Sequence, residues 1–491
     1  MSIENTRIFI KQKAEEFGAK IDWTKDRQEF ERNNTSAEAL NDDGGYFGFI
    51  NPEEDPSGVF HDFSFTIFPS NPQDVDANGN TKPWLVCLGI GSSGFKNDYE
   101  AASFPGLRRI FSKLVDEEGF CKTDFLDIET SLPKSFRENP KLIHFKKTLK
   151  KNNYDKVLPA CQIVDDPESD TGKKVISAFV AGYAKLREWA TNDPQRKAIS
   201  KALESFLKQD HTIDEDEDEV SKLLIERRFV VLQGPPGTGK TRTAKAVVDK
   251  LNAVSIFTQF HAETSYSDFI YGIRPDIKKD SISYIPVIGK FTEALLEAQK
   301  PDSGNVVLII DEINRANLAN VLGPIFYLFE HKMEASSVKI EITSDLKIDK
   351  LPDNLYVIAT MNTADRSLAV VDFALRRRFA WYDLKPKSIS GKKKKLTDIN
   401  VLEIENSDNF FFVEDYTKVS EIFYWHASSP ELSLQPGQGY FIALNIEEMT
   451  NRIKYEIFPL IKEYIQEGLL RSAKEEFNNY FMSRINQSLF E

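Results

Sequence analysis

The sequence contains few cysteines and no long apolar segment. Its three cysteines, Cys87, Cys121 and Cys161, lie far apart and show no paired spacing. This usage is typical of a reducing compartment and does not predict a zinc site. No apolar run reaches the roughly 18 residues that a membrane-spanning helix requires, and the first residues lack the basic and apolar stretches of a signal peptide. We therefore expect a cytoplasmic protein that makes no contact with a membrane.

The sequence is also poor in positive charge. Its 491 residues include 63 lysines and arginines against 76 acids, which gives a formal net charge of −13. An acidic surface disfavours nonspecific nucleic-acid binding by the whole protein, although it permits a local basic patch. The length predicts about two to four domains, each able to bury its own core.

One stretch organises the rest of the chain. The apolar residues 229–232 lead into Gly-x-x-x-x-Gly-Lys-Thr, and the following residues continue at helical spacing. This order of strand, loop and helix predicts a phosphate-binding loop, because the glycines let consecutive backbone N–H groups turn toward phosphates. Lys240 adds a positive charge, and Thr241 offers its hydroxyl to Mg²⁺. The predicted nucleotide-binding residues are Gly234, Pro235, Pro236, Gly237, Thr238, Gly239, Lys240 and Thr241.

Two further strands of the same region end in polar side chains. Strand and helix patterns alternate over residues 223–385, which predicts an α/β domain with a parallel sheet. One buried apolar strand ends at Asp311, placed to hold Mg²⁺, and Glu312, placed to orient or deprotonate the attacking water. Another ends at Asn362, where a side chain can sense the γ-phosphate or its water. The sequence therefore predicts a Mg²⁺-dependent nucleoside triphosphatase.

Residues 1–207 show a different pattern. Aromatic-rich segments alternate at period two between helical stretches, which predicts an α+β domain. Within it, residues 134–156 carry eight basic side chains against two acids. This stretch is interpreted either as a DNA-contacting face or as an ordinary solvated helix face. The candidate phosphate contacts are Lys146, Lys147, Lys150 and Lys151, and the candidate base contacts, which can equally belong to the core, are Trp84 and Phe95.

Two segments flank the predicted α/β domain. The six consecutive acids of residues 214–219 predict an extended, acidic linker over residues 208–222, because like charges repel. Residues 386–491 begin with a lysine run at 392–395, which we expect to be a loop in an insertion, and end in apolar residues at helical spacing. They predict a helical lid with no chemistry of its own.

The region after the acidic run resembles a known family. A phosphate loop, paired acids and a strand-terminal Asn362 occur in the order of the AAA+ class of ring-forming NTPases. More specifically, Met-Asn-Thr-Ala-Asp-Arg-Ser-Leu at 361–368 and Arg-Arg-Arg-Phe at 376–379 resemble the McrB family. These are the GTP-driven motor subunits of restriction complexes that act on DNA carrying modified cytosine. The resemblance covers about residues 223–470 and includes the stretches 259–275, 311–318 and 455–464.

The resemblance implies GTP or ATP and Mg²⁺ as cofactors. It implies that Asn362 and Asp365 position the hydrolytic water, and that Arg377 or Arg378 enters the neighbouring subunit's site as an arginine finger. It also implies a homo-oligomeric, hexameric ring, a separate McrC-like nuclease subunit and DNA recognition by the N-terminal domain. In one departure, this chain has Gly-Gln-Gly-Tyr-Phe at 437–441 where the family usually has Gly-His-Ser-Tyr-Phe. A second sensor contributed from there is therefore not predicted.

Two classes of function remain open. The first is the motor of a DNA restriction or phage-defence complex, and the second is a MoxR-like AAA+ ATPase that remodels protein complexes. Phosphate loops bind phosphates and not bases, so the choice between GTP and ATP stays open. No Asp…Glu-x-Lys cluster of a nuclease stands outside the motor region. We therefore expect this chain to have no nuclease activity of its own.

Overall fold

The computed structural model describes residues 3–20, 30–52, 61–71, 82–150, 153–206, 213–276, 283–329, 340–343, 346–364, 373–397, 399–405 and 407–490. The chain forms two compact units. The first contains Met1–Gln209 and Tyr424–His426, and the second contains Asp210–Phe423 and Ala427–Glu491. None of the helices in the described ranges combines the length and the apolar character that a membrane crossing needs.

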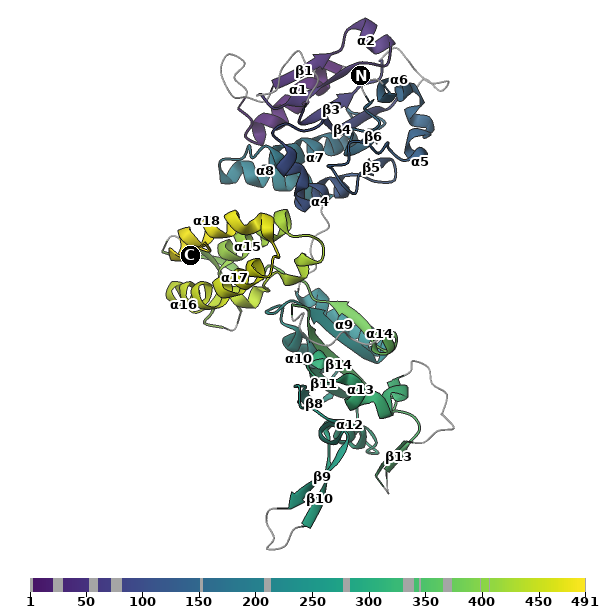
Figure 1. The fold of residues 1–491 in the computed structure, drawn as a ribbon, viewed down its shortest axis with the longest axis vertical. Helices are drawn as coiled ribbons and strands as arrows, with labels where there is room; N and C mark the ends of the chain where they lie inside the picture. Colours follow the sequence, from purple (N-terminus) through teal and green to yellow (C-terminus); the bar gives the residue numbers. More distant parts are fainter. Residues whose placement is uncertain are drawn as a thin grey trace. The chain divides into compact units, whose positions relative to one another are not determined.

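The first unit is built on a six-stranded antiparallel sheet with the strand order β1-β2-β3-β4-β6-β5 (Figure 1). Aromatic and aliphatic residues fill its central strands, as in a sheet that is covered on both faces. The predicted α+β domain with an aromatic-rich sheet is thereby confirmed. The strands are β1 (Phe30–Asn34), β2 (Tyr46–Ile50), β3 (Phe63–Phe68), β4 (Trp84–Ile90), β5 (Gly119–Cys121) and β6 (Ala160–Val164).

Helices and apolar side chains cover both faces of this sheet. Residues of α1, α4, α7 and α8 pack in one core, and residues of α5, η1 and α6 pack in a second. The helices are α1 (Ile3–Glu16), α2 (Ala37–Asn41), α3 (Tyr99–Ser103), α4 (Pro105–Leu114), α5 (Lys134–Arg137), η1 (Pro140–Phe145), α6 (Lys146–Lys150), α7 (Asp170–Leu186) and α8 (Asp193–Glu204).

Strand β4 shows why the aromatic side chains of this unit belong to the core. Successive residues of a strand point to opposite faces, so Trp84 enters the first core while Leu85 enters the second. The Trp84 side chain is 2% exposed, and its ring meets Phe47 edge to face. Phe95 is half-buried, with its ring 5.2 Å from that of Phe63. The interpretation of Trp84 as a base contact is therefore wrong, because no base can reach a side chain inside the core.

The second unit contains a five-stranded parallel sheet with the order β15-β7-β14-β11-β8. Its register sets Gly234 beside Asn362 and Asp311 beside Gln259. The carboxyl ends of the central strands therefore meet at one edge, where open α/β sheets bind their ligands. These strands are β7 (Phe229–Gly234), β8 (Val254–Gln259), β11 (Val306–Asp311), β14 (Leu355–Asn362) and β15 (Ala380–Asp383).

Helices pack on both faces of the parallel sheet. α9 and α10 contribute to the apolar core on one face, and α12, α13 and η4 contribute to the core on the other. Two β-hairpins, β9–β10 and β12–β13, extend from this part of the unit (Figure 1). The elements are α9 (Ile213–Arg227), α10 (Lys240–Lys250), α11 (Tyr266–Phe269), β9 (Tyr271–Asp276), β10 (Ser283–Ile288), α12 (Lys290–Ala298), η3 (Ile313–Arg315), α13 (Leu318–Leu322), η4 (Gly323–Phe329), β12 (Ile340–Thr343), β13 (Leu346–Ile348) and α14 (Phe373–Arg378).

The acidic run at 214–219 lies within α9. The prediction of an extended acidic linker over residues 208–222 was wrong for this helical part, while residues 207–212 lie outside the described ranges. The helix buries Val220 and Leu224 completely in the core that it shares with β7 and α10. Packing of this apolar face outweighs the repulsion between neighbouring acids.

Cations and a phenol compensate the buried acids of α9. Asp216 is 4% exposed, accepts a hydrogen bond of 2.7 Å from the Tyr382 hydroxyl and pairs with Lys387 Nζ at 2.6 Å. Glu217 pairs with two basic side chains of α10. Burial, together with the hydrogen bonds to Asp216 and Glu219, raises the pKa of Tyr382 because the phenolate would face two carboxylates.

The C-terminal part combines a small antiparallel sheet, β16-β17-β18-β19, with helices around one apolar core. The predicted helical lid is confirmed, but the lysine run at 392–395 forms β16 and not a loop. Lysines suit this position because β16 is an edge strand, where charge blocks further strand pairing. The elements are β16 (Lys392–Leu396), β17 (Ile399–Glu403), β18 (Phe410–Phe411), α15 (Val413–His426), η5 (Glu431–Leu434), η6 (Gln438–Phe441), β19 (Ile442–Ala443), α16 (Ile446–Arg452), η7 (Ile453–Ile457), α17 (Phe458–Gln466), η8 (Arg471–Ala473) and α18 (Lys474–Ile485).

Candidate active site

The predicted phosphate-binding loop connects the end of β7 to the start of α10. Gly237 and Gly239 have φ angles of +79° and +86°. Residues that carry a Cβ atom rarely adopt such angles. The 11-residue helix α10 begins at Lys240, so its N-terminal partial positive charge lies at the end of the loop. A cavity of about 250 Å³ opens beside the loop. Its lining residues are Pro236, Gly237, Gly239, Lys240, Thr241, Arg242, Glu312, Thr360 and Asn362.

Lys240 is held inside this loop. Its ammonium donates hydrogen bonds of 2.9 and 2.8 Å to the carbonyl oxygens of Gly234 and Pro235. The Thr238 hydroxyl donates to the Pro235 carbonyl oxygen at 2.9 Å, which tightens the same turn. A cation held in this way adds its charge to the cavity at a fixed place.

A chain of hydrogen bonds joins three elements at the edge of the sheet. The Thr241 and Thr360 hydroxyls donate to Asp311 Oδ1 at 2.8 and 2.7 Å, and the Thr360 hydroxyl accepts from the backbone N–H of Glu312 at 3.1 Å. Hydroxyl and carboxylate oxygens are the ligands that Mg²⁺ prefers. Thr241 and Asp311 therefore suit the predicted metal-binding role, and such an ion would bring a Lewis acid to the phosphates.

Thr360 is a site residue that the sequence reasoning missed. It lies two positions before Asn362 on β14 and is 1% exposed. Its hydroxyl contacts both the Asp311 carboxylate and the backbone N–H of Glu312. A hydroxyl inside an otherwise apolar strand was the available signal, because buried polar groups need a partner.

Glu312 has an unusual backbone conformation. Its φ and ψ are 54° and 48°, in the left-handed region, which costs a residue with a side chain about 1–2 kcal/mol. The Glu312 side chain lines the cavity, and its Oε2 lies 3.3 Å from Arg315 Nε. This conformation directs the chain from β11 into η3 directly after the buried strand.

The other predicted catalytic residues lie at different places. Asn362 lines the cavity at the end of β14, and its Oδ1 accepts from the backbone N–H of Ala364 at 3.2 Å. Asp365 lies outside the described residues. Arg377 is exposed on α14, whereas Arg378 is half-buried, with its guanidinium 4.8 Å from the centre of the Phe326 ring. Neither arginine lines the cavity of its own chain.

The basic stretch at 134–156 is partly neutralised. Lys141 pairs with Glu118 at 2.6 Å and Asp165 at 2.8 Å, and Lys147 pairs with Asp42 at 3.2 Å. The described lysines of the candidate DNA contact, Lys146, Lys147 and Lys150, are exposed, while Lys151 lies outside the described residues.

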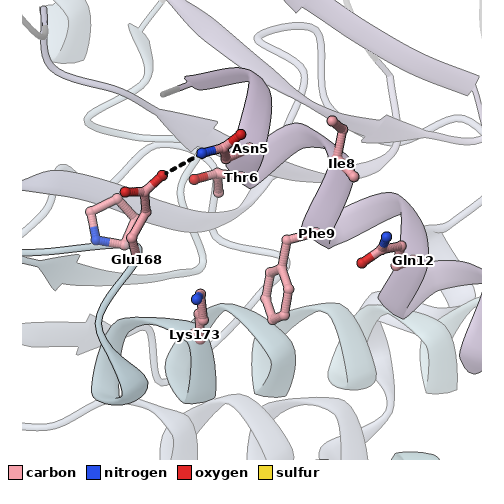
Figure 2. A pocket seen from close by; sticks show the side chains of 8 residues that line it. Asn5, Thr6, Ile8, Phe9, Gln12, Glu168 and Lys173 are labelled. Carbon is pink, nitrogen blue, oxygen red and sulfur yellow. Dashed lines mark hydrogen bonds between the residues drawn. The ribbon is translucent and has the colours of Figure 1, made fainter. Parts of the chain in front are cut away.

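A larger cavity, of about 530 Å³, lies in the first unit between α1 and the start of α7 (Figure 2). Asn5 donates a hydrogen bond of 3.0 Å across it to Glu168, and Phe9 and Lys173 face one another beside it. Its described lining contains one carboxylate and no glycine-rich loop. This cavity therefore lacks the groups that phosphate chemistry requires, despite its size.

Comparison with known proteins identifies the second unit's sheet region. Residues 229–379 match the family described as AAA domain (dynein-related subfamily). Over 201 residues the chain is 37% identical to the Type IV methyl-directed restriction enzyme EcoKMcrB subunit of Escherichia coli K12, a match that covers 39% of this chain and 43% of that protein. Part of this chain is McrB-like.

A second relative is the Type II restriction enzyme BsuMI component YdiS of Bacillus subtilis 168. It is 32% identical over 189 residues, which cover 31% of this chain and 55% of that protein. The chain thus spans about half the length of these two relatives.

Among solved structures, a putative ATPase from Cytophaga hutchinsonii covers 35% of this chain and 46% of its own, with 19% identity and a TM-score of 0.25. The match to the Thermotoga maritima RuvB Holliday junction branch migration motor covers 37% of this chain and 49% of that protein, with 21% identity and a TM-score of 0.22.

Proposed function

We propose that this chain is the ring-forming motor subunit of a DNA restriction or phage-defence complex, driven by hydrolysis of GTP or ATP. The observation that carries the proposal is the hydrogen-bonded chain from Thr241 through Asp311 and Thr360 to Glu312, beside a phosphate-binding loop. Both relatives are components of restriction enzymes by name, which supports restriction over MoxR-like remodelling of protein complexes.

In this function each predicted site residue has a role. Lys240 and the loop N–H groups bind the phosphates, and Thr241 and Asp311 hold Mg²⁺. Glu312 orients and deprotonates the attacking water, and Asn362 positions it, since both side chains line the same cavity. Asp365 assists Asn362, and an arginine of α14 completes the site of a neighbouring subunit in a hexameric ring. DNA cleavage then belongs to a separate, McrC-like nuclease subunit.

Turnover of GTP and ATP by the purified full-length chain, with and without duplex DNA, tests this function. We expect Mg²⁺-dependent hydrolysis that is lost on chelation of the metal. Hydrolysis of ATP alone, with stimulation by a protein substrate and not by DNA, would favour the MoxR-like alternative.

Lys240→Ala should weaken nucleotide binding by about 10- to 100-fold, because it removes a charge-assisted contact to phosphate. Binding of fluorescent mant-GDP and mant-ADP measures the effect. Lys245→Ala is a matched control, since Lys245 lies on the same helix and does not line the cavity. Equal affinities of the Lys240→Ala and unmodified chains would remove Lys240 from the phosphate site.

The first unit is proposed to bind DNA through its exposed lysines at 146, 147 and 150. Replacing all three with Gln should lower the slope of log affinity against log salt by about 0.9 for each phosphate that a lysine no longer neutralises, and should weaken all duplex sequences alike. Fluorescence anisotropy of the full-length chain at several salt concentrations measures both effects.

The control for this experiment removes equal charge elsewhere on the same unit. Lys173, Lys174 and Lys201 are exposed on α7 and α8, and their replacement with Gln should leave the salt slope unchanged. Equal slopes for the two triple variants would show that the stretch at 134–156 is an ordinary solvated face.

A further inference from the structure

The lid contacts the phosphate-binding loop through one short segment, Gly437–Gln438–Gly439. The backbone N–H of Gly437 donates to the Pro236 carbonyl oxygen at 2.9 Å, and that of Gly439 donates to the Gly237 carbonyl oxygen at 2.9 Å. Three consecutive loop carbonyls therefore accept hydrogen bonds from three consecutive lid residues, because Gln438 Nε2 donates to the Thr238 carbonyl oxygen, also at 2.9 Å.

The two backbones approach closely because both are glycine-rich here. A Cβ atom on Gly437 would lie 2.2 Å from the Gly237 carbonyl carbon, and a Cβ atom on Gly237 would lie 2.7 Å from the Tyr440 ring. Only hydrogen is tolerated at such distances. The glycines on both sides thus serve this contact as well as the turn of the loop.

Gln438 also binds the segment that follows β15, so that this segment joins the contact between the lid and the phosphate-binding loop. Its Oε1 accepts from the backbone N–H of Lys387 at 3.2 Å, in the segment that follows β15, and its side chain is buried with 6% exposed. Lys387 in turn pairs with Asp216 of α9. One amide side chain therefore joins the lid, the phosphate-binding loop and the segment that follows the edge strand β15.

These hydrogen bonds determine where the loop N–H groups point. In a planar trans peptide the C=O and the following N–H point in opposite directions. Because the lid segment binds the carbonyls of residues 236, 237 and 238, the N–H groups of Gly237, Thr238 and Gly239 are directed away from the lid segment. Phosphate-binding loops use such N–H groups to hold phosphate oxygens.

We propose that Gln438 is a positioning residue for nucleotide binding, which holds the loop N–H groups in their phosphate-binding orientation from the lid. The proposal rests on the proposed NTPase function of the same loop. Gln438 is one of the two positions at which this chain departs from the Gly-His-Ser-Tyr-Phe run. Lid docking and phosphate binding then stabilise each other, because both require the same orientation of three peptide groups.

Gln438→Glu tests this role, since it keeps the shape of the side chain and replaces the donor to the Thr238 carbonyl with a carboxylate oxygen. We expect the Kd for mant-GDP or mant-ADP, and the KM for the triphosphate, to rise by about 10-fold or more. We expect kcat at saturating triphosphate to change less than KM. The melting temperature without nucleotide should fall, because the buried carboxylate faces the Thr238 carbonyl oxygen.

Gln435→Glu provides the matched control. Gln435 lies three residues away, and its Nε2 donates to Ser420 Oγ at 2.9 Å within the lid. The same chemical change there should leave Kd and KM unaltered. Equal effects of the two variants, or a loss of kcat at unchanged KM, would overturn the positioning role.

Gln438→Met is a second variant that introduces no charge, and it should raise KM in the same direction. Binding of mant-nucleotide to the unmodified chain separates the proposed NTPase function from the positioning role of Gln438. If that chain binds neither mant-GDP nor mant-ADP, the proposed function fails. If it binds them and both Gln438 variants match it, the positioning role alone is wrong.

Discussion

Glu312→Gln should slow nucleotide hydrolysis by about two to four orders of magnitude while leaving nucleotide and Mg²⁺ binding nearly intact. The amide cannot accept a proton from water, whereas the phosphate and metal contacts come from other residues. Single-turnover hydrolysis and mant-nucleotide binding, measured on the same preparation, separate the two effects.

Asp349→Asn supplies a control for this substitution, because Asp349 is an acid of the same unit that does not line the cavity. The melting temperature should also change little, since the Glu312 side chain pairs with Arg315, which is exposed. A Glu312→Gln chain that hydrolyses nucleotide at a near-normal rate would show that the water is activated by another group.

The second large effect concerns the arginines of α14. Arg377→Ala should reduce turnover by about 10³-fold or more if its guanidinium stabilises the transition state in a neighbouring subunit. Arg377 is the stronger candidate because its side chain is exposed, whereas Arg378 stacks against Phe326 within its own chain. Turnover per subunit should also rise with protein concentration as rings assemble.

Mixing two inactive chains tests the action in trans. Arg377→Ala chains keep Glu312, and Glu312→Gln chains keep Arg377, so their mixed interfaces contain complete sites. An equimolar mixture should recover up to about a quarter of the unmodified rate, since roughly one interface in four combines the two intact residues.

Arg376→Ala is the control for the mixing experiment, because Arg376 lies on the same helix with its guanidinium over the ring of Trp381. The Arg376→Ala chain should hydrolyse nucleotide on its own, without a second variant in the mixture. No recovery in the mixture, despite ring formation, would show that Arg377 acts within its own subunit or not at all. The same pair of experiments with Arg378→Ala decides between the two arginines.

The sequence predicts the phosphate-binding loop well because that loop is local. Its glycines, Lys240 and Thr241 stand within eight consecutive residues, and the backbone geometry follows from their types. Asp311 and Glu312 could be placed for the same reason, since they stand at the end of a buried apolar strand. The hydroxyl of Thr360 in a buried strand marks it as a candidate but does not identify its partners, and Gln438 carries no such mark. The roles of both depend on contacts with residues far away in the chain.

The two wrong secondary-structure predictions have one cause. Each treats a charge run in isolation, whereas the folded chain supplies partners for the charges. Tyr382 and Lys387 face the acids of α9. In β16, Lys394 pairs with Glu403 at 3.0 Å, and its ammonium lies 4.9 Å from the centre of the Phe410 ring. Local repulsion is small compared with such packing, because exposed like charges are screened by solvent.

The packing of α9 in the core determines how far the second unit can be shortened at its N-terminal side and still fold. A shortened chain that starts at residue 223 would leave the buried ammonium of Lys387 without the Asp216 carboxylate and would uncover the apolar surface that Val220 protects. An unpaired buried charge and a newly exposed apolar face both promote unfolding and aggregation. We therefore expect the smallest part of the second unit that folds on its own to include all of α9 with its acidic residues.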